Sequence, residues 1–171
     1  ITKVEPVIEA VRRDGDDAIA RFIKEFDGAD VDANQLLATE AEFEAAFESL
    51  DNEFIDVLRY AADNIRRFHE MQKPQDIWWT EIRPGVKVGE RATPIESVAL
   101  YSPRGKGSFP SVTLMTAIPA VVAGVPHPII LTPPGPQGEI DPATLVPARL
   151  TGVERVARAG GRLAVAADAF G

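Results

Sequence analysis

The chain of 171 residues is 45% hydrophobic and carries a formal net charge of −8, which suits one packed domain or two small ones. This acidic balance argues against nucleic acid and membrane surfaces as partners. Without cysteine the chain forms neither disulfides nor thiolate metal sites, which fits a cytoplasmic protein. No apolar run is long enough to span a membrane, and no signal-peptide pattern opens the chain. Because it starts at Ile1 and stops at Gly171 directly after an apolar helical run, we expect a piece of a longer protein.

The first part of the chain predicts helices. Apolar residues at helical spacing place one helix over residues 4–13 and a second over residues 16–26. Asp16 or Asp17 is the expected N-cap of the second helix. Residues 29–38 are polar and without periodicity, which predicts a loop.

Two further helices follow. Thr39 and Glu42 have the spacing of a capping box, so a helix is expected to begin there. Asp51 starts the longest helix, which ends before Pro74. Its predicted apolar stripe consists of Phe54, Val57, Leu58, Ala61, Ile65 and Phe68. The acidic residues of this helical region are expected to form a solvated face.

The pattern changes over residues 75–96. Aromatic and β-branched residues are interrupted there by Pro84-Gly85 and Gly89, which is typical of a short hairpin or two edge strands. Trp78 and Trp79 belong to this segment. Packing along an edge strand is the simpler interpretation of both, and stacking on a bound ring is the alternative.

Beyond residue 96, strands and helices alternate in a βαβαβα order. Strands are predicted over residues 98–101, 129–132 and 155–159, and helices over residues 111–123, 141–151 and 162–170. Right-handed crossovers make these strands parallel. The predicted fold class is therefore α/β, with a helical N-terminal region over residues 1–78 followed by an incomplete parallel-sheet domain over residues 79–171.

Three helix ends and one helix interior carry specific signals. Ser111 is the expected N-cap of one helix, and Gly124 is expected to end it in the left-handed conformation. Asp141 followed by Pro142 is a strong helix start. Pro147 is expected to kink or shorten that same helix, because proline lacks the N–H that the helix interior uses.

Three loops meet at the carboxyl edge of such a sheet, where α/β proteins bind ligands: residues 101–107, residues 133–138 and Gly160-Gly161. Arg104, Lys106 and their glycines suit an anion at a helix N-terminus, and an ordinary solvent-exposed loop with two cations is an equal alternative. Gly160-Gly161 is a weaker signal of the same kind, and a bare tight turn explains it more simply. Neither a Walker loop nor a complete G-x-G-x-x-G is present.

His69 and His127, the two histidines, share no spacing with other metal ligands, so we predict no metal site within this chain. Neither has the serine and acid pattern of nucleophilic catalysis around it. Glu70 is a candidate base, but an exposed carboxylate at a helix end is the commoner case.

Many segments, in their order along the chain, closely resemble the N-terminal part of histidinol dehydrogenase. They are residues 11–18 (VRRDGDDA), 26–28 (FDG), 64–72 (NIRRFHEMQ), 84–86 (PGV), 89–91 (GER), 94–95 (PI), 98–103 (VALYSP), 110–115 (PSVTLM), 123–124 (AG), 152–153 (GV) and 160–171 (GGRLAVAADAFG). The resemblance covers nearly the whole chain.

This resemblance implies an NAD-dependent, zinc-containing, homodimeric enzyme of histidine biosynthesis that oxidises L-histidinol through the aldehyde to L-histidine. The family fold has two Rossmann-like halves, and the segment from about Trp79 onward would begin the half that holds NAD. The family's NAD-contacting tyrosine corresponds to Tyr101. Its Gly-Gly-Ala-Gln motif corresponds to Gly160 and Gly161, with the NAD-binding glutamine at Leu163. The family's catalytic Glu-His pair and its zinc ligands would lie beyond this chain, which carries no catalytic residue of its own by this comparison.

Two departures from the family pattern leave alternatives open. The family's Gly-Gly after the proline is here Arg104-Gly105, and Leu163 cannot make the hydrogen bonds of glutamine. One alternative is a paralogous NAD-dependent dehydrogenase of another small alcohol. The other is a truncated, non-catalytic relative that acts through a partner.

Overall fold

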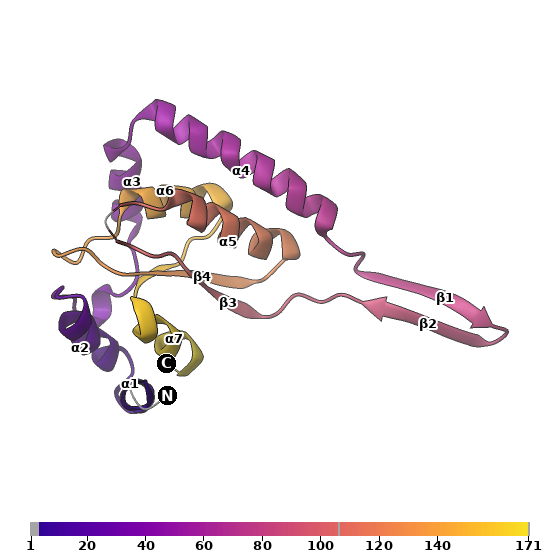
Figure 1. Ribbon diagram of the computed structural model, residues 1–171, viewed down its shortest axis with the longest axis horizontal. Coiled ribbons are helices and arrows are strands. Elements are labelled where there is room, and N and C mark those ends of the chain that lie inside the picture. Colours follow the sequence, from indigo (N-terminus) through magenta and orange to yellow (C-terminus); the bar gives the residue numbers. More distant parts are fainter. Residues whose placement is uncertain (1–3, 106, 171) are drawn as a thin grey trace.

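The computed structural model describes residues 4–105 and 107–170 and confirms the α/β class. Helices surround a three-stranded sheet, and a two-stranded hairpin extends away from this body (Figure 1). The helices are α1 (Glu5–Asp14), α2 (Asp16–Phe26), the 3-10 helix η1 (Ala33–Gln35), α3 (Glu40–Ser49), α4 (Asn52–Gln72), α5 (Pro110–Ala123), α6 (Pro142–Thr151) and α7 (Gly161–Phe170). The strands are β1 (Ile77–Arg83), β2 (Val86–Arg91), β3 (Ser97–Tyr101), β4 (His127–Thr132) and β5 (Val156–Arg158).

The main sheet is parallel, as predicted, and its strand order is β3-β4-β5. Leu100 of β3 lies opposite Ile130 of β4, which in turn lies opposite Val156 of β5. The other two strands, β1 and β2, form the predicted hairpin, with antiparallel pairing.

The outer edge of β5 is covered by residues 36–38, inside the segment predicted as a loop. The N–H of Ala38 donates to the carbonyl of Val156, and the N–H of Arg158 donates to the carbonyl of Leu36, each over 2.8 Å. This antiparallel contact satisfies backbone groups that an open sheet edge would expose.

The two faces of the sheet pack on different helices. Leu100, Ile130 and Val156 face one way and share a core with α5, α6, α3 and α4. Leu131 and Ala159 face the other way, against α7, and α7 in turn packs on α1 and α2. Figure 1 shows this arrangement, with α5 and α6 on one side of β3 and β4 and α7 on the other. Residues of α3 and α4 share one hydrophobic core with the sheet. The predicted domain boundary between residues 78 and 79 stays a prediction.

Two predicted N-caps are wrong. Helix α5 begins at Pro110 with Phe109 as its N-cap, so Ser111 already lies inside the first turn. Proline at the first position needs no N–H partner, which explains the earlier start. The N-cap of α2 is Gly15, at φ +56°, and the carboxylates of Asp16 and Asp17 lie in the first turn instead.

The other predicted helix ends are confirmed. The side chain of Asp141 accepts from the N–H of Ala143, and Gly124 ends α5 at φ +83° in the left-handed conformation. Pro147 is buried within α6 and does not shorten it. Among the described residues, no helix combines the length and the apolar character needed to cross a bilayer.

The predicted stripe on α4 is only partly correct. Leu58 is buried as expected, but its fully buried neighbours are Ile55 and Ala62. Val57 and Phe68 are 57% and 58% exposed. Apolar residues occur on more than one side of α4, so periodicity alone does not identify the side that meets α5 and α6.

Candidate functional site

Tyr101 and Gly161 meet at the carboxyl edge of the sheet. Tyr101 ends β3, and Gly161 begins α7 just after β5. The backbone N–H of Gly161 donates to the hydroxyl oxygen of Tyr101 over 3.3 Å. The tyrosine remains 43% exposed, so its ring is available to a ligand. Two residues that sequence comparison assigns to NAD binding therefore lie side by side.

Gly160 lies in a tight space, where an added Cβ would force its neighbours to shift. A Cβ at this position would sit 3.0 Å from both carboxylate oxygens of Asp27 and 3.1 Å from Cβ of Pro133. The neighbouring Gly161 has φ +50°, a backbone conformation that L-residues with side chains rarely adopt. The tight turn predicted here is thus real, and it also brings the backbone close to its neighbours, as a cofactor cradle requires.

Asp27 also lies at this edge, and the sequence analysis did not predict it as a site residue. Its N–H donates to the carbonyl of Ile23 at the end of α2, and its carboxylate lies against Gly160. Oxygen Oδ2 is buried and has no hydrogen-bond partner among the described residues. This burial raises the pKa of the Asp27 carboxyl above its usual value. An acidic residue directly before a glycine at a helix end gives little sign of such burial.

Leu163, the remaining predicted cofactor residue, is fully buried. It packs among apolar residues of α1 and α2 rather than on the surface. Its role in NAD binding stays a prediction from the resemblance, and its side chain contributes to the core.

Arg104 is not the free cation that the sequence predicts. Its guanidinium donates to the Glu139 carboxylate over 2.8 Å and to the Glu139 carbonyl over 3.2 Å, which ties the loop after β3 to the loop after β4. Partial burial pulls the pKa of Glu139 upward, but the hydrogen bonds from Arg104 and from backbone N–H groups outweigh it and leave the pKa lowered. Gly135 fits beneath this pair, since a Cβ there would overlap the side chains of both residues. Lys106, the second predicted cation, lies outside the described residues.

A second link joins the same two loops. The hydroxyl of Ser108 donates to Oδ2 of Asp141 over 2.5 Å, while Oδ1 of Asp141 caps α6. The loop after β3 is therefore held at two points, by Arg104 and by Ser108.

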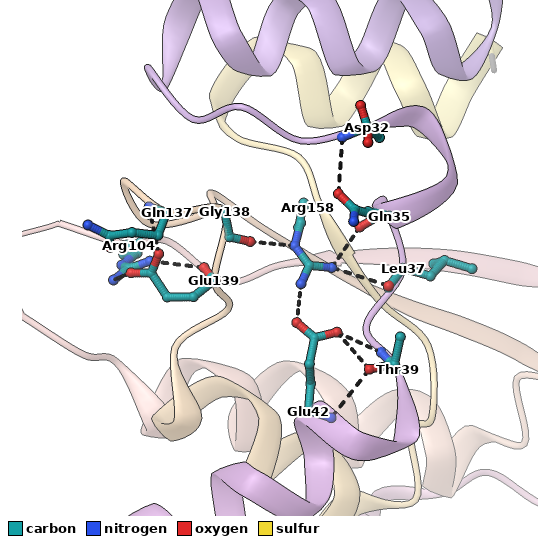
Figure 2. Close-up of polar contacts among 10 residues, drawn as sticks. All are labelled: Asp32, Gln35, Leu37, Thr39, Glu42, Arg104, Gln137, Gly138, Glu139 and Arg158. Atoms are coloured by element: carbon teal, nitrogen blue, oxygen red, sulfur yellow. Dashed lines mark hydrogen bonds and ion pairs between the residues drawn. The ribbon is translucent and has the colours of Figure 1, made fainter.

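Arg158, which the sequence predictions did not single out, is the most connected side chain near this edge (Figure 2). Its side chain is 7% exposed. Nε donates to the carbonyl of Gly138 over 2.6 Å, and Nη1 donates to the carbonyls of Gln35 and Leu37 over 2.8 and 3.2 Å. Nη2 pairs with the carboxylate of Glu42. One guanidinium thus binds three separate segments: the loop at Gly138, residues 35–37 and helix α3.

Glu42 is correspondingly not part of a solvated acidic face. As predicted, it forms a capping box with Thr39, whose N–H donates to its Oε2 over 2.8 Å, but its other oxygen pairs with Arg158. The available signal was an arginine between Ala157 and Ala159, because a charge inside an apolar strand needs a buried partner.

Two cavities lie away from Tyr101. One, of about 340 Å³, is bounded by Glu42, Glu139 and Arg158. The other, of about 540 Å³, lies on the α7 side of the sheet beside Ile129 and Ala157. The described residues contain no group of three or more His, Cys, Asp or Glu side chains positioned to hold a metal ion.

The two tryptophans lie in β1 and are both exposed. The indole N–H of Trp78 donates to Glu90 of β2 over 3.2 Å, and Nζ of Lys87 lies 4.1 Å from the centre of the Trp79 ring. Both contacts join β1 to β2, as expected if the tryptophans pack within the hairpin.

Comparison with known proteins agrees with this architecture. The family model of histidinol dehydrogenase matches residues 1–171. A histidinol dehydrogenase homolog of Rhizobium meliloti is 60% identical over the whole chain, and the histidinol dehydrogenase of Methanosarcina mazei is 44% identical over 98% of it. The crystal structure of histidinol dehydrogenase from Elizabethkingia anophelis superposes with a TM-score of 0.94 at 34% identity, over 99% of this chain and 39% of that one.

The chain spans about 38% of the length of these relatives. The family match includes all the segments on which the resemblance noted from the sequence rests. The chain belongs to the histidinol dehydrogenase family.

Proposed function

We propose that the complete protein carrying this chain is an NAD-dependent dehydrogenase that oxidises L-histidinol through the aldehyde to L-histidine. The observation that carries the proposal is the contact between Tyr101 and Gly161 at the carboxyl edge of the sheet, within a chain of this family. In this proposal the chain supplies part of the cofactor site, and the catalytic residues lie elsewhere in the complete protein.

The residues present suit a dinucleotide. The exposed ring of Tyr101 offers an apolar face for stacking, and its hydroxyl is oriented by the N–H of Gly161. Gly160 leaves the backbone free of a side chain at the turn into α7. NAD, when bound, supplies the acceptor for the hydride of the alcohol.

The topology also favours this place. Helices α5 and α6 lie on one face of the sheet and α7 on the other, and right-handed crossovers on opposite faces run in opposite directions across a sheet. Because residues 36–38 cover the outer edge of β5, a parallel strand following α7 would join at β3. The strand order would then reverse at β3, and α/β sheets bind ligands at such reversals. Tyr101 stands at that point.

Further features are expected from the resemblance alone. They are zinc, a homodimeric assembly and a place in the cytoplasm, and no step of the proposal passes through them.

A second candidate is a paralogous dehydrogenase of another small alcohol. Four relatives named histidinol dehydrogenase homolog are 52–60% identical to the chain, whereas four named histidinol dehydrogenase are 42–45% identical. The pairing of Arg104 with Glu139, where the resemblance expects glycine at residue 104, also favours it.

The two candidates are separated by assaying NADH formation by the complete protein. L-histidinol and a panel of other small primary and secondary alcohols would be compared at equal concentration. The first candidate predicts that L-histidinol has the highest kcat/KM. A higher kcat/KM for another alcohol selects the second, and no NADH formation with any alcohol contradicts both.

A further inference from the structure

Asp27 lies beside the turn whose next residue, Gly161, binds the Tyr101 hydroxyl. Its carboxylate is in contact with Gly160, the residue before the amide that binds the Tyr101 hydroxyl. Cβ of Pro133, which follows β4 directly, lies at the same turn, 3.1 Å from the position that a Cβ of Gly160 would take. The acid is therefore at the carboxyl edge of the sheet, although it comes from α2, far away in the sequence.

No side chain explains why an acid stands there. Within the described part of the chain, Oδ2 has no hydrogen-bond partner, and no cation forms an ion pair with Asp27. The carboxylate lies close to Gly160. Burial at this position raises the pKa of Asp27, because it disfavours the charged form. An apolar residue or an asparagine would be less costly for folding alone.

An ionised carboxylate only accepts hydrogen bonds, so its ligand must donate. The pyrophosphate of a dinucleotide is anionic and would be repelled. The ribose hydroxyls are donors, and carboxylates recognise ribose at the strand ends of other dinucleotide-binding sheets.

We infer that the carboxylate of Asp27 accepts a hydrogen bond from a ribose hydroxyl of the bound dinucleotide, as a further cofactor-binding residue. The inference rests on the proposed NAD site at Tyr101. It assigns the donor to the cofactor rather than to another part of the protein.

The test is calorimetric titration of NAD into the complete protein and into Asp27→Asn, which keeps the shape and removes the charge. Loss of a hydrogen bond to a charged acceptor raises the NAD dissociation constant by about 10- to 100-fold. The melting temperature does not fall, because the variant removes a buried charge without a partner. Asp30→Asn is the matched control, since Asp30 has a side chain 85% exposed and pairs with Lys24. Its dissociation constant is unchanged.

NAD analogues that lack one ribose hydroxyl each locate the donor. For one analogue, the dissociation constant for the wild type exceeds that of NAD by about the same factor by which Asp27→Asn raises the dissociation constant of NAD. The dissociation constant of this analogue is the same for Asp27→Asn as for the wild type. The inference is overturned if Asp27→Asn weakens the binding of every analogue by the same factor as it weakens the binding of NAD. It is also overturned if the dissociation constant of NAD is unchanged in Asp27→Asn, with or without a fall in melting temperature. If the wild type itself binds no NAD, the proposed function fails as well, so the two failures are told apart.

Discussion

The hydroxyl oxygen of Tyr101 and the backbone N–H of Gly161 are 3.3 Å apart, although 60 positions separate the two residues in the chain. This contact joins the end of β3 to the start of α7 across the carboxyl edge of the sheet. It fixes the tyrosine hydroxyl but leaves the ring exposed. The proposed cofactor site at this edge thus has an exposed aromatic ring whose hydroxyl is hydrogen-bonded.

Replacing Arg158 is expected to destabilise the protein strongly. Arg158→Met removes a guanidinium that is nearly inaccessible and binds three carbonyls and Glu42. Breaking a buried ion pair from one side costs about 3 kcal/mol in the free energy of unfolding, because the remaining groups lose their partner. Thermal unfolding of the complete protein measures the loss.

The control for Arg158 is Lys24→Met. Lys24 pairs with Asp30 at 2.9 Å, but both side chains are mostly exposed, so its loss costs about 0.5 kcal/mol or less. The double variant Arg158→Met plus Glu42→Gln, which removes both charges of the pair, is expected to be more stable than Arg158→Met alone. Equal melting temperatures for Arg158→Met and Lys24→Met would show that the buried network contributes nothing.

Gly135→Ala tests whether the Arg104–Glu139 pair needs the space it occupies. The added methyl group would overlap both side chains, so the pair must separate or the loop must shift. Because the overlapping atoms are the ends of two flexible, partly exposed side chains, the expected cost is that of losing the ion pair, up to about 1 kcal/mol. Gly107→Ala, in the neighbouring loop, has no atom within 4 Å of the new Cβ and is expected to change stability by about 0.5 kcal/mol or less. Melting temperatures that do not distinguish the two variants would contradict the described packing.

Glu139→Gln tests the lowered pKa of Glu139 through the pH dependence of stability. A carboxyl whose pKa is lower in the folded state stabilises the fold above its unfolded pKa, and this stabilisation is lost as the pH falls through the folded pKa. At neutral pH the free energy of unfolding of the wild type is expected to exceed that of the variant by about 0.5–1 kcal/mol. The difference is small because Glu139 is partly exposed.

Urea unfolding at several pH values measures this difference, which should disappear toward acid pH. Glu44→Gln, at an exposed position of α3, is the control and shows no such trend. A difference between Glu139→Gln and wild type that stays constant over the whole pH range would mean that the charge of Glu139 is not what stabilises the loops.

The fold was largely predictable from the sequence because its signals are local. Apolar periodicity, the capping box at Thr39 and the αL glycine at Gly124 each act within a few residues, and each is confirmed. The phase of α4 was not predictable in the same way. Which of its apolar sides is buried depends on α5 and α6, which come later in the chain.

The site was predictable as a place but not in its contacts. Parallel topology brings the loops after β3, β4 and β5 to one edge whatever their side chains are. Arg104 was expected to be free because its partner Glu139 lies 35 residues further on, and Arg158 meets Glu42 across 116 residues. Asp27 reaches Gly160 from another helix layer. Pairings of this kind depend on tertiary packing, which spacing along the sequence does not encode.

The most direct test is the dissociation constant of NAD for the complete protein and for Tyr101→Ala. Loss of the stacking ring is expected to weaken binding by about 10- to 100-fold. Tyr101→Phe, which loses only the contact with Gly161, should weaken it by about 10-fold at most. Tyr60→Ala, a tyrosine 71% exposed on α4, should leave it unchanged. An unchanged dissociation constant in Tyr101→Ala would contradict a cofactor site at this edge of the sheet.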